Sequence, residues 1–330
     1  MQNAFATLLA GLALGICVSA SASPTREAEE GYLRTDDGTR IFYQKIGRGD
    51  QVVIVPVRLF AFEAFKTLAD QFTVISYDPR GRGRSDPIAD ADKPAMIGIH
   101  QDVADLERLR KHFNAPKVSL IGYSYTGLMV VMYAMEFPDR VKRIVQLGPV
   151  PMKFGTEYPK NLTATDQPAD PKQLEELRRL QKENYPATHP REYCEKEWSY
   201  LRVGLVGDPA RVGKVSAQPC AMPNEWPVNL AKLFEVAFVT IQKLDLPRDK
   251  IAAVKAPVLT IHGTKDRNAP YGGGREWALT LTNARLLTIE GGGHQAFEEF
   301  GEIVLPAVRQ FLAGDWPEKA SRVKALDPAS

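Results

Sequence analysis

The 330-residue sequence predicts an α/β protein with a doubly wound, mostly parallel eight-stranded sheet and an inserted helical cap. Three observations support this fold class. Short apolar runs rich in β-branched residues alternate with helical stretches. Several of these runs end in loops that carry polar side chains, which is where open parallel sheets place their sites. A stretch of about 100 residues, from 151 to 250, shows no strand alternation.

The expected elements follow in chain order. The runs Ile97 to Phe113, Leu128 to Glu136 and Phe297 to Leu312 are expected to be helices of the core. The core then comprises residues 23–150 and 251–330, and residues 151–250 form a cap with helices near 172–183, 191–203 and 230–243. The strands are expected at Gly31 to Thr35, Arg40 to Lys45, Val52 to Val55, Phe72 to Tyr77, Lys117 to Ile121, Arg143 to Leu147, Val258 to Ile261 and Arg285 to Ile289.

Residues 1–22 are expected to be an export signal. Phe5 to Ala20 is a run of apolar and small residues, and Ala20-Ser21-Ala22 offers a cleavage site before Arg26, the first charged residue. No lysine or arginine precedes the run, and an uncleaved anchor is the alternative, although about 16 residues are short for a bilayer span. We therefore expect a secreted or periplasmic protein, cleaved near Ala22 and without a stable membrane span.

Composition argues against several classes of partner. The net charge is +2 and there is no basic block, so no nucleic-acid partner is expected. Gly81 and Gly83 complete neither a dinucleotide fingerprint nor a phosphate loop, and no spacing such as H-E-x-x-H is present. We expect neither a cofactor nor a metal.

The segment VSLIGYSYTG, residues 118–127, is typical of a strand that turns sharply into a helix with a serine at the apex. Gly122 and Ser124 fit the pattern G-x-S-x-G. Thr126 occupies the second glycine position, and Gly127 follows it. Such a turn exposes the serine hydroxyl above the edge of the sheet, as a nucleophile requires.

Two further loops carry groups that could assist this serine. The strand in APVLTIHGTKDR leads to Asp266, and the strand in ARLLTIEGGGH leads to His294. The strand expected at Arg143 to Leu147, which comes before both of these, ends in Leu147-Gly148-Pro149, without a carboxylate. The other histidines, which fall in or beside predicted helices, in a proline-flanked loop or at a strand end, are His100, His112, His189 and His262.

These motifs resemble those of the α/β-hydrolase family, and the resemblance covers nearly the whole mature chain. The segments TVISYDPRGRGRSD and EFPDRVKRIVQLGP also resemble segments of that family. The resemblance implies that Ser124 is the nucleophile, that His294 is the general base and acid, and that Asp266 orients His294. The chemistry needs all three groups. A serine hydroxyl is a poor nucleophile near neutral pH, a histidine can accept its proton there, and a carboxylate stabilises the resulting cation.

The sequence departs from the family at the predicted oxyanion hole. The amide of Tyr125 is expected to supply one donor. The second is expected from the loop after Val52 to Val55, where relatives carry His-Gly and this chain has Pro56, Val57 and Arg58. Proline has no N–H, so Val57 or Arg58 must donate. Loss of the glycine removes easy access to positive φ at this loop.

Four side chains are predicted to bind substrate: Arg58, Tyr123, Trp198 and Trp226. Arg58 would attract a substrate carboxylate if it faced the mouth of the pocket, and a solvated surface position is the alternative. The cap aromatic residues line a pocket or pack the core of the cap. Cys194 and Cys220, the only cysteines after the signal, are either a disulfide or two separate thiols.

These observations predict an exported serine hydrolase that cleaves a small, carboxylesterase-type ester through an acyl-enzyme. The alternative is an aminopeptidase that resembles the proline iminopeptidases and acts on short peptides. In those enzymes cap carboxylates hold the free amine of the substrate, a role open here to Glu192, Glu195 and Glu197. The elbow GYSYTG, however, differs from their GGSWG form. A non-catalytic binding protein on the same fold is the alternative of another class.

Overall fold

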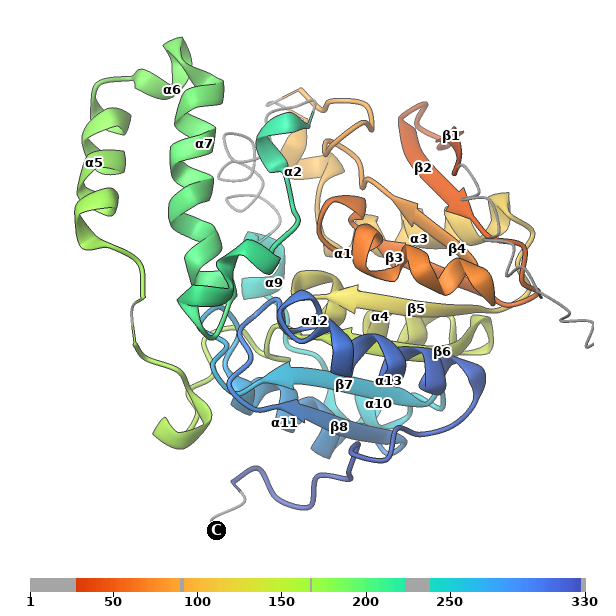
Figure 1. Cartoon of the computed structure of the whole chain (residues 1–330). Helices are drawn as coiled ribbons and strands as arrows, with labels where there is room; N and C mark the ends of the chain where they lie inside the picture. The colour runs from red at the N-terminus through yellow and green to blue at the C-terminus, as the bar shows by residue number, and fades with distance from the viewer. Residues whose placement is uncertain (1–27, 90–91, 167, 223–237, 328–330) are drawn as a thin grey trace, which may run out of the picture.

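A computed structural model describes residues 28–89, 92–166, 168–222 and 238–327, and its centre is one eight-stranded sheet (Figure 1). The strand order is β1-β2-β4-β3-β5-β6-β7-β8. β1 pairs antiparallel with β2 and β2 with β4, whereas every later pair is parallel. The strands are β1 (Glu29–Arg34), β2 (Arg40–Ile46), β3 (Val52–Pro56), β4 (Thr73–Tyr77), β5 (Val118–Tyr123), β6 (Val141–Leu147), β7 (Val258–Gly263) and β8 (Ala284–Ile289).

Helices cover both faces of this sheet, which confirms the predicted fold class. On one face lie α3 (Ile99–His112), α4 (Tyr125–Glu136), α10 (Arg248–Ala252) and α11 (Tyr271–Thr280). On the other lie α1 (Arg58–Phe65), α12 (Ala296–Glu299) and α13 (Gly301–Ala313). Ile54 packs with the first group, and its neighbours Val53 and Val55 pack with the second. Because both faces are covered, β5 and β7 are buried along their whole length.

The predicted cap lies between β6 and β7. Its described parts contain helices and short 3₁₀ turns, and no strand was found in them. Figure 1 shows α5, α6 and α7 beyond one end of the sheet. The predicted helices near 172–183 and 191–203 are present, whereas most of the one near 230–243 lies outside the described residues, as does the predicted signal. The cap elements are η3 (Lys160–Leu162), α5 (Pro171–Lys182), α6 (Tyr185–Thr188), α7 (Pro190–Leu201), η4 (Arg202–Leu205), η5 (Pro209–Lys214), η6 (Pro219–Ala221) and α9 (Val239–Gln242).

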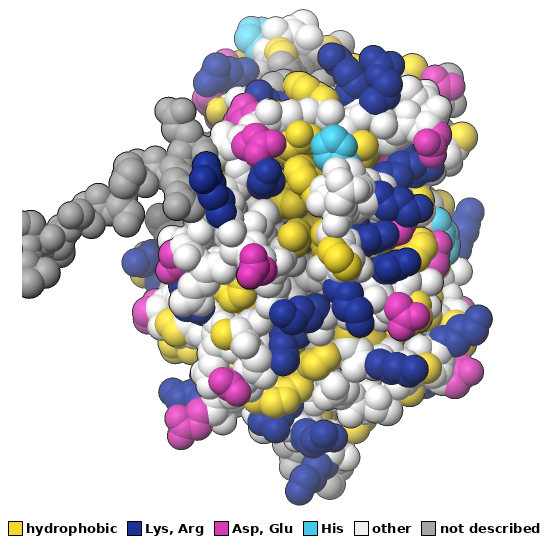
Figure 2. All heavy atoms as spheres, turned by 90° about the vertical axis from the view of Figure 1, so that its right-hand side faces the viewer, with side chains coloured by type: hydrophobic (Ala, Val, Ile, Leu, Met, Phe, Trp, Pro, Cys, Tyr) yellow, Lys and Arg dark blue, Asp and Glu magenta, His cyan; other side chains and the backbone are white. Residues whose placement is uncertain are grey.

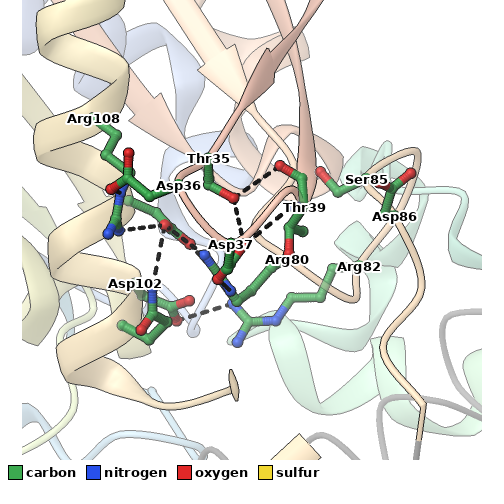
Figure 3. Close-up of polar contacts among 12 residues, drawn as sticks. Thr35, Asp36, Asp37, Thr39, Arg80, Arg82, Ser85, Asp86, Asp102 and Arg108 are labelled. Carbon is green, nitrogen blue, oxygen red and sulfur yellow. Dashed lines mark hydrogen bonds and ion pairs between the residues drawn. The ribbon is translucent and has the colours of Figure 1, made fainter. Parts of the chain in front are cut away.

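A buried ionic network fixes the loop after β4 (Figure 3). The Arg80 side chain, which is fully buried, bonds both carboxylate oxygens of Asp105 at 2.6 and 2.8 Å and Asp37 at 2.7 Å. Asp105 lies on α3, and Asp37 lies in the turn between β1 and β2. The loop is therefore fastened to a helix and to the antiparallel hairpin. The remaining short elements are η1 (Lys66–Asp70), α2 (Lys93–Met96) and η2 (Pro138–Arg140).

The face on the β1 side carries basic and acidic side chains interspersed with small apolar areas (Figure 2). This pattern agrees with the small net charge of +2. In the part of the chain that the structure describes, no helix is long and apolar enough to cross a bilayer.

Cys194 and Cys220 form a disulfide, which answers the question that the sequence left open. The sulfur atoms lie 2.10 Å apart and the Cα atoms 5.8 Å apart. Cys194 lies on α7 and Cys220 on η6, so the bond joins the long cap helix to a turn 26 residues later. A cross-link of this kind restricts the unfolded chain.

Replacing both cysteines with serine is expected to lower the free energy of unfolding by roughly 3 kcal/mol, because the unfolded chain regains the freedom that the loop had lost. The measurement is chemical denaturation followed by circular dichroism, with and without a reducing agent. The double variant is its own control, since a reducing agent should no longer change its stability. Equal stability of the oxidised wild type and the double variant would contradict the expectation.

Candidate active site

Ser124 sits at a strained turn between β5 and α4. Its φ and ψ angles are 53° and −119°, a conformation that residues other than glycine rarely adopt. The Ser124 amide donates to the Leu147 carbonyl at the end of β6 (2.9 Å), and α4 begins at Tyr125. The serine is thus held at the N-terminus of a helix, where amide groups and the helix dipole favour developing negative charge.

Thr126, the departure from G-x-S-x-G, stabilises this turn. Its hydroxyl accepts a hydrogen bond from the Tyr123 amide (2.8 Å) and lies 2.9 Å from the Tyr123 carbonyl, to which it donates. Space is tight at Gly122 and Gly127 instead. A Cβ atom at Gly122 would lie 2.3 Å from the Thr126 carbonyl oxygen, and one at Gly127 would lie 2.9 Å from Pro149. The second glycine of the pattern is therefore needed one position later than expected.

Asp266 and His294 come together from the loops after β7 and β8. His294 Nδ1 lies 2.7 Å from Asp266 Oδ2, and both side chains are buried. The other carboxylate oxygen, Oδ1, accepts from the amides of Asn268 (2.9 Å) and Ala269 (2.8 Å). A carboxylate at Nδ1 favours the tautomer with the proton on that nitrogen, which leaves Nε2 as a proton acceptor.

His262, which the sequence placed only at a strand end, also contacts this carboxylate. Its Nε2 lies 3.1 Å from Asp266 Oδ2 and 2.9 Å from the Ala269 carbonyl, and the side chain is fully buried. Burial raises the pKa of Asp266, but the electrostatic attraction of His294 and hydrogen bonds from both histidines outweigh it, so the pKa lies well below its usual range. The four-residue spacing from His262 to Asp266 around the end of β7 was the only sequence signal for this contact.

A segment of the cap, Gly204 to Asp208, is hydrogen-bonded to the two loops that carry Asp266 and His294. From the loop after β7, the Asn268 side chain donates to the Gly204 carbonyl (2.9 Å) and Arg267 to the Val206 carbonyl (2.6 Å). From the loop after β8, the Gln295 amide donates to the Leu205 carbonyl (2.8 Å). The cap and the two loops therefore form one bonded unit.

Glycines allow this close approach of two backbones. A Cβ atom at Gly293 would lie 2.3 Å from the Val206 carbonyl carbon, and one at Gly207 would lie 1.9 Å from the Gly291 carbonyl oxygen. The buried Glu299 carboxylate accepts from the amides of Gly293 (2.8 Å) and Gly207 (2.9 Å). The glycines before His294 thus allow their loop to pack closely against the cap segment.

Ser124 and His294 line the same cavity, which has a volume of about 560 Å³. Most of its described wall is apolar. The predicted pocket residues Tyr123 and Trp198 line it as well, whereas Trp226 lies outside the described residues. The remaining lining residues come from the loops after β3, β4, β6 and β7, from α1 and α4 and from the cap: Val57, Phe60, Arg82, Tyr125, Thr126, Val150, Pro151, Phe154, Gly155, Thr156, Leu201, Leu205, Phe238, Asn268 and Pro270.

Residues 58–300 match the family model described as alpha/beta hydrolase fold. The chain belongs to the α/β-hydrolase family. It is a serine hydrolase, in accordance with its relatives. Serine hydrolase BPHL from Mus musculus is 23% identical over 283 residues, which cover 84% of each chain. The human BPHL is 34% identical over 119 residues, a match that spans 40% of that protein and 34% of this chain.

Solved structures of other hydrolases share the architecture. The esterase EaEST from Exiguobacterium antarcticum superposes with a TM-score of 0.63 at 18% identity, over 86% of this chain and 99% of that one. The serine hydrolase CCSP0084 from Cycloclasticus zankles gives a TM-score of 0.64 at 17% identity, over 87% of this chain and 99% of that one. At this identity the likeness concerns the fold.

Val57 adopts a left-handed backbone conformation. Its φ is 61° and its ψ 77°, an unfavourable region for a β-branched residue. α1 begins directly after it, and Val57 lines the cavity together with Tyr125. Replacement of the glycine has therefore not prevented the left-handed turn. That the amide of Val57 or Arg58 joins that of Tyr125 in an oxyanion hole stays a prediction.

The side chain of Arg58 lies away from the described wall of this cavity. Its Nε is 3.7 Å from Asp78 Oδ1, its Nη2 is 3.2 Å from the Met222 sulfur, and its guanidinium lies over the Phe42 ring, 5.9 Å from the centroid. That Arg58 binds a substrate carboxylate stays a prediction. In the structure the buried Asp78 attracts its guanidinium.

Gly293→Ala is expected to reduce kcat/KM by about 100-fold, because the new methyl group must push His294 or the cap segment out of place and small misplacements are costly in catalysis. The measurement is steady-state hydrolysis of an aryl ester together with thermal unfolding. Gly213→Ala is the matched control, since nothing lies within 4 Å of a Cβ at that position. Wild-type kcat/KM in the Gly293 variant would contradict the expected packing.

Proposed function

We propose that this serine hydrolase is an exported carboxylesterase that uses Ser124, His294 and Asp266 as a catalytic triad. The observation that carries the proposal is the joint position of Ser124 and His294 on one largely apolar cavity, with His294 Nδ1 2.7 Å from the buried Asp266. The strained conformation of Ser124 agrees with a nucleophile held in place by its surroundings.

The reaction follows from these positions. His294 Nε2 takes the hydroxyl proton as Ser124 Oγ attacks the ester carbonyl, and the resulting oxyanion is stabilised by the Tyr125 amide and by that of Val57 or Arg58. The tetrahedral intermediate collapses, and His294 gives its proton to the departing alkoxide. Water, deprotonated by His294, then attacks the acyl-enzyme, and His294 returns the proton to Ser124 Oγ as the acid is released. Asp266 stabilises the imidazolium in both halves of the reaction.

The described cavity wall favours an ester over a substrate with a free amine. None of the described lining residues is acidic. Of the cap glutamates, Glu195 is exposed and pairs with Arg191, and Glu197 accepts from the Tyr193 hydroxyl at 3.4 Å. An aminopeptidase of the proline-iminopeptidase type would need such a carboxylate in the cavity to hold the amine.

A fluorophosphonate probe is expected to label the wild type and not Ser124→Ala, because only an activated serine reacts with it. Phenyl butanoate is expected to be cleaved, whereas proline anilide is not. A folded wild type that resists labelling would refute the triad. Rapid cleavage of proline anilide, with dependence on its free amine, would identify an aminopeptidase instead.

Export is supported by the disulfide, because such bonds persist in oxidising compartments. When the full-length gene is expressed in a Gram-negative host, the mature protein is expected outside the cytoplasm with its N-terminus near Ser23. Mass spectrometry of the purified protein measures this directly. A full-length protein that remains in the cytoplasm with both thiols reduced would exclude export.

A further inference from the structure

Arg82 brings a positive charge to the wall of the cavity. Among the described residues that line it, Arg82 is the only lysine, arginine, aspartate or glutamate. It lies in the loop after β4, between Gly81 and Gly83, and is 6% exposed. A guanidinium is protonated at all physiological pH values, so the otherwise apolar cavity faces a permanent cation.

The counter-ion of Arg82 lies behind the wall. Asp102, on α3, accepts from Arg82 Nη1 at 3.1 Å and from the Tyr125 hydroxyl at 3.0 Å, and it is not among the lining residues. Figure 3 shows the Arg82 guanidinium directed toward Asp102. Tyr125, which directly follows Ser124 and lines the cavity, is thus bonded to the same carboxylate as Arg82. The Arg82 guanidinium lies 5.9 Å from the centroid of that ring.

Arg80, two residues earlier, has the contacts expected of a purely structural arginine. It is fully buried, binds both oxygens of Asp105, also binds Asp37, and does not line the cavity. Arg82 is also buried and paired, but it makes fewer bonds and it lines the cavity. One hydrogen bond joins it to Asp102 in the described part of the chain, and Asp102 Oδ1 has no partner there. A guanidinium has five N–H donors, so most of those of Arg82 remain for a ligand.

We propose that Arg82 binds a carboxylate of the substrate, so that the enzyme prefers esters carrying a carboxylate at a distance from the scissile bond. This inference rests on the proposed esterase function. An anionic group entering an apolar cavity loses its hydration and needs a charged partner, which Arg82 supplies. The sequence predicted this type of recognition at Arg58, and the structure places Arg82 on the wall of the cavity.

Two matched pairs of substrates test the proposal. In the first pair, phenyl hydrogen adipate carries the carboxylate on the acyl side and phenyl hexanoate lacks it. In the second, 4-carboxyphenyl butanoate carries it on the leaving group and 4-carbamoylphenyl butanoate is neutral. For each pair the ratio of kcat/KM, charged over neutral, is compared between the wild type and Arg82→Gln. We expect the ratio to fall by about tenfold or more in at least one pair, as loss of a charged hydrogen bond predicts.

Arg84→Gln is the matched control. Arg84 lies on the same loop, but it is partly exposed, pairs with Glu30 and does not line the cavity. Its ratios should equal those of the wild type. Because Arg82→Gln leaves Asp102 without its counter-ion, the double variant Arg82→Gln with Asp102→Asn provides a second test if the single variant fails to fold. Arg82→Lys, which keeps the charge, should retain part of the preference.

The two arms distinguish where the carboxylate lies. A fall confined to the adipate pair places it on the acyl side, and a fall confined to the aryl pair places it on the leaving group. Unchanged ratios in both pairs, or a wild type that prefers the neutral member of each, would overturn the proposal. A failure of the esterase function is seen separately, as absence of both turnover and fluorophosphonate labelling.

Binding provides a measurement that does not depend on turnover. In the Ser124→Ala background, the Kd of phenyl hydrogen adipate is measured by calorimetry with and without Arg82→Gln. An increase of about tenfold that is absent for phenyl hexanoate supports the proposal even if hydrolysis fails. Equal effects on the two ligands would indicate that Arg82 only shapes the wall.

Discussion

The buried carboxylate of Asp266 is the interaction on which the candidate site depends. It collects four contacts within the hydrogen-bond range: one from each of two histidine rings and two from backbone amides of its own loop. A buried charge is stable only when it is paired and hydrogen-bonded in this way. The carboxylate consequently fixes the loop after β7 and, through His294, the loop after β8. The two loops, which are distant in sequence, are held together because both provide hydrogen bonds to this one carboxylate.

Much of the fold could be predicted because local patterns of apolar residues mark its strands and helices. The parallel strands β3 to β8 are short, largely buried runs, and parallel strands bring their loops to one edge whatever their order. Ser124, Asp266 and His294 each follow such a strand, so their proximity followed from the architecture. The helix expected from Leu128 in fact begins at Tyr125, because the turn at Ser124 leads into it without a loop.

Other features depend on contacts that no local pattern encodes. His262 touches Asp266 because the chain reverses after β7, and its sequence neighbours resemble those of an ordinary core residue. Arg58 and Arg82 could not be distinguished by composition, since both are arginines that follow strands ending at the same edge. Asp78 pairs with Arg58, whereas Asp102 pairs with Arg82, which lines the cavity. Val57 shows that surrounding structure can impose a conformation that its own preference opposes.

The bonded unit of cap and loops constrains how such a protein can diversify. Leu205 lines the cavity while its carbonyl accepts from Gln295, next to His294, so pocket shape and catalytic geometry share one stretch of backbone. Substitutions there that alter the backbone would change both properties together, and their effects would not be additive. In the part of the chain that the structure describes, Trp198 and Leu201 line the cavity from α7 without a hydrogen bond to either loop. New specificities should therefore arise more readily from the long cap helix than from the segment that anchors it.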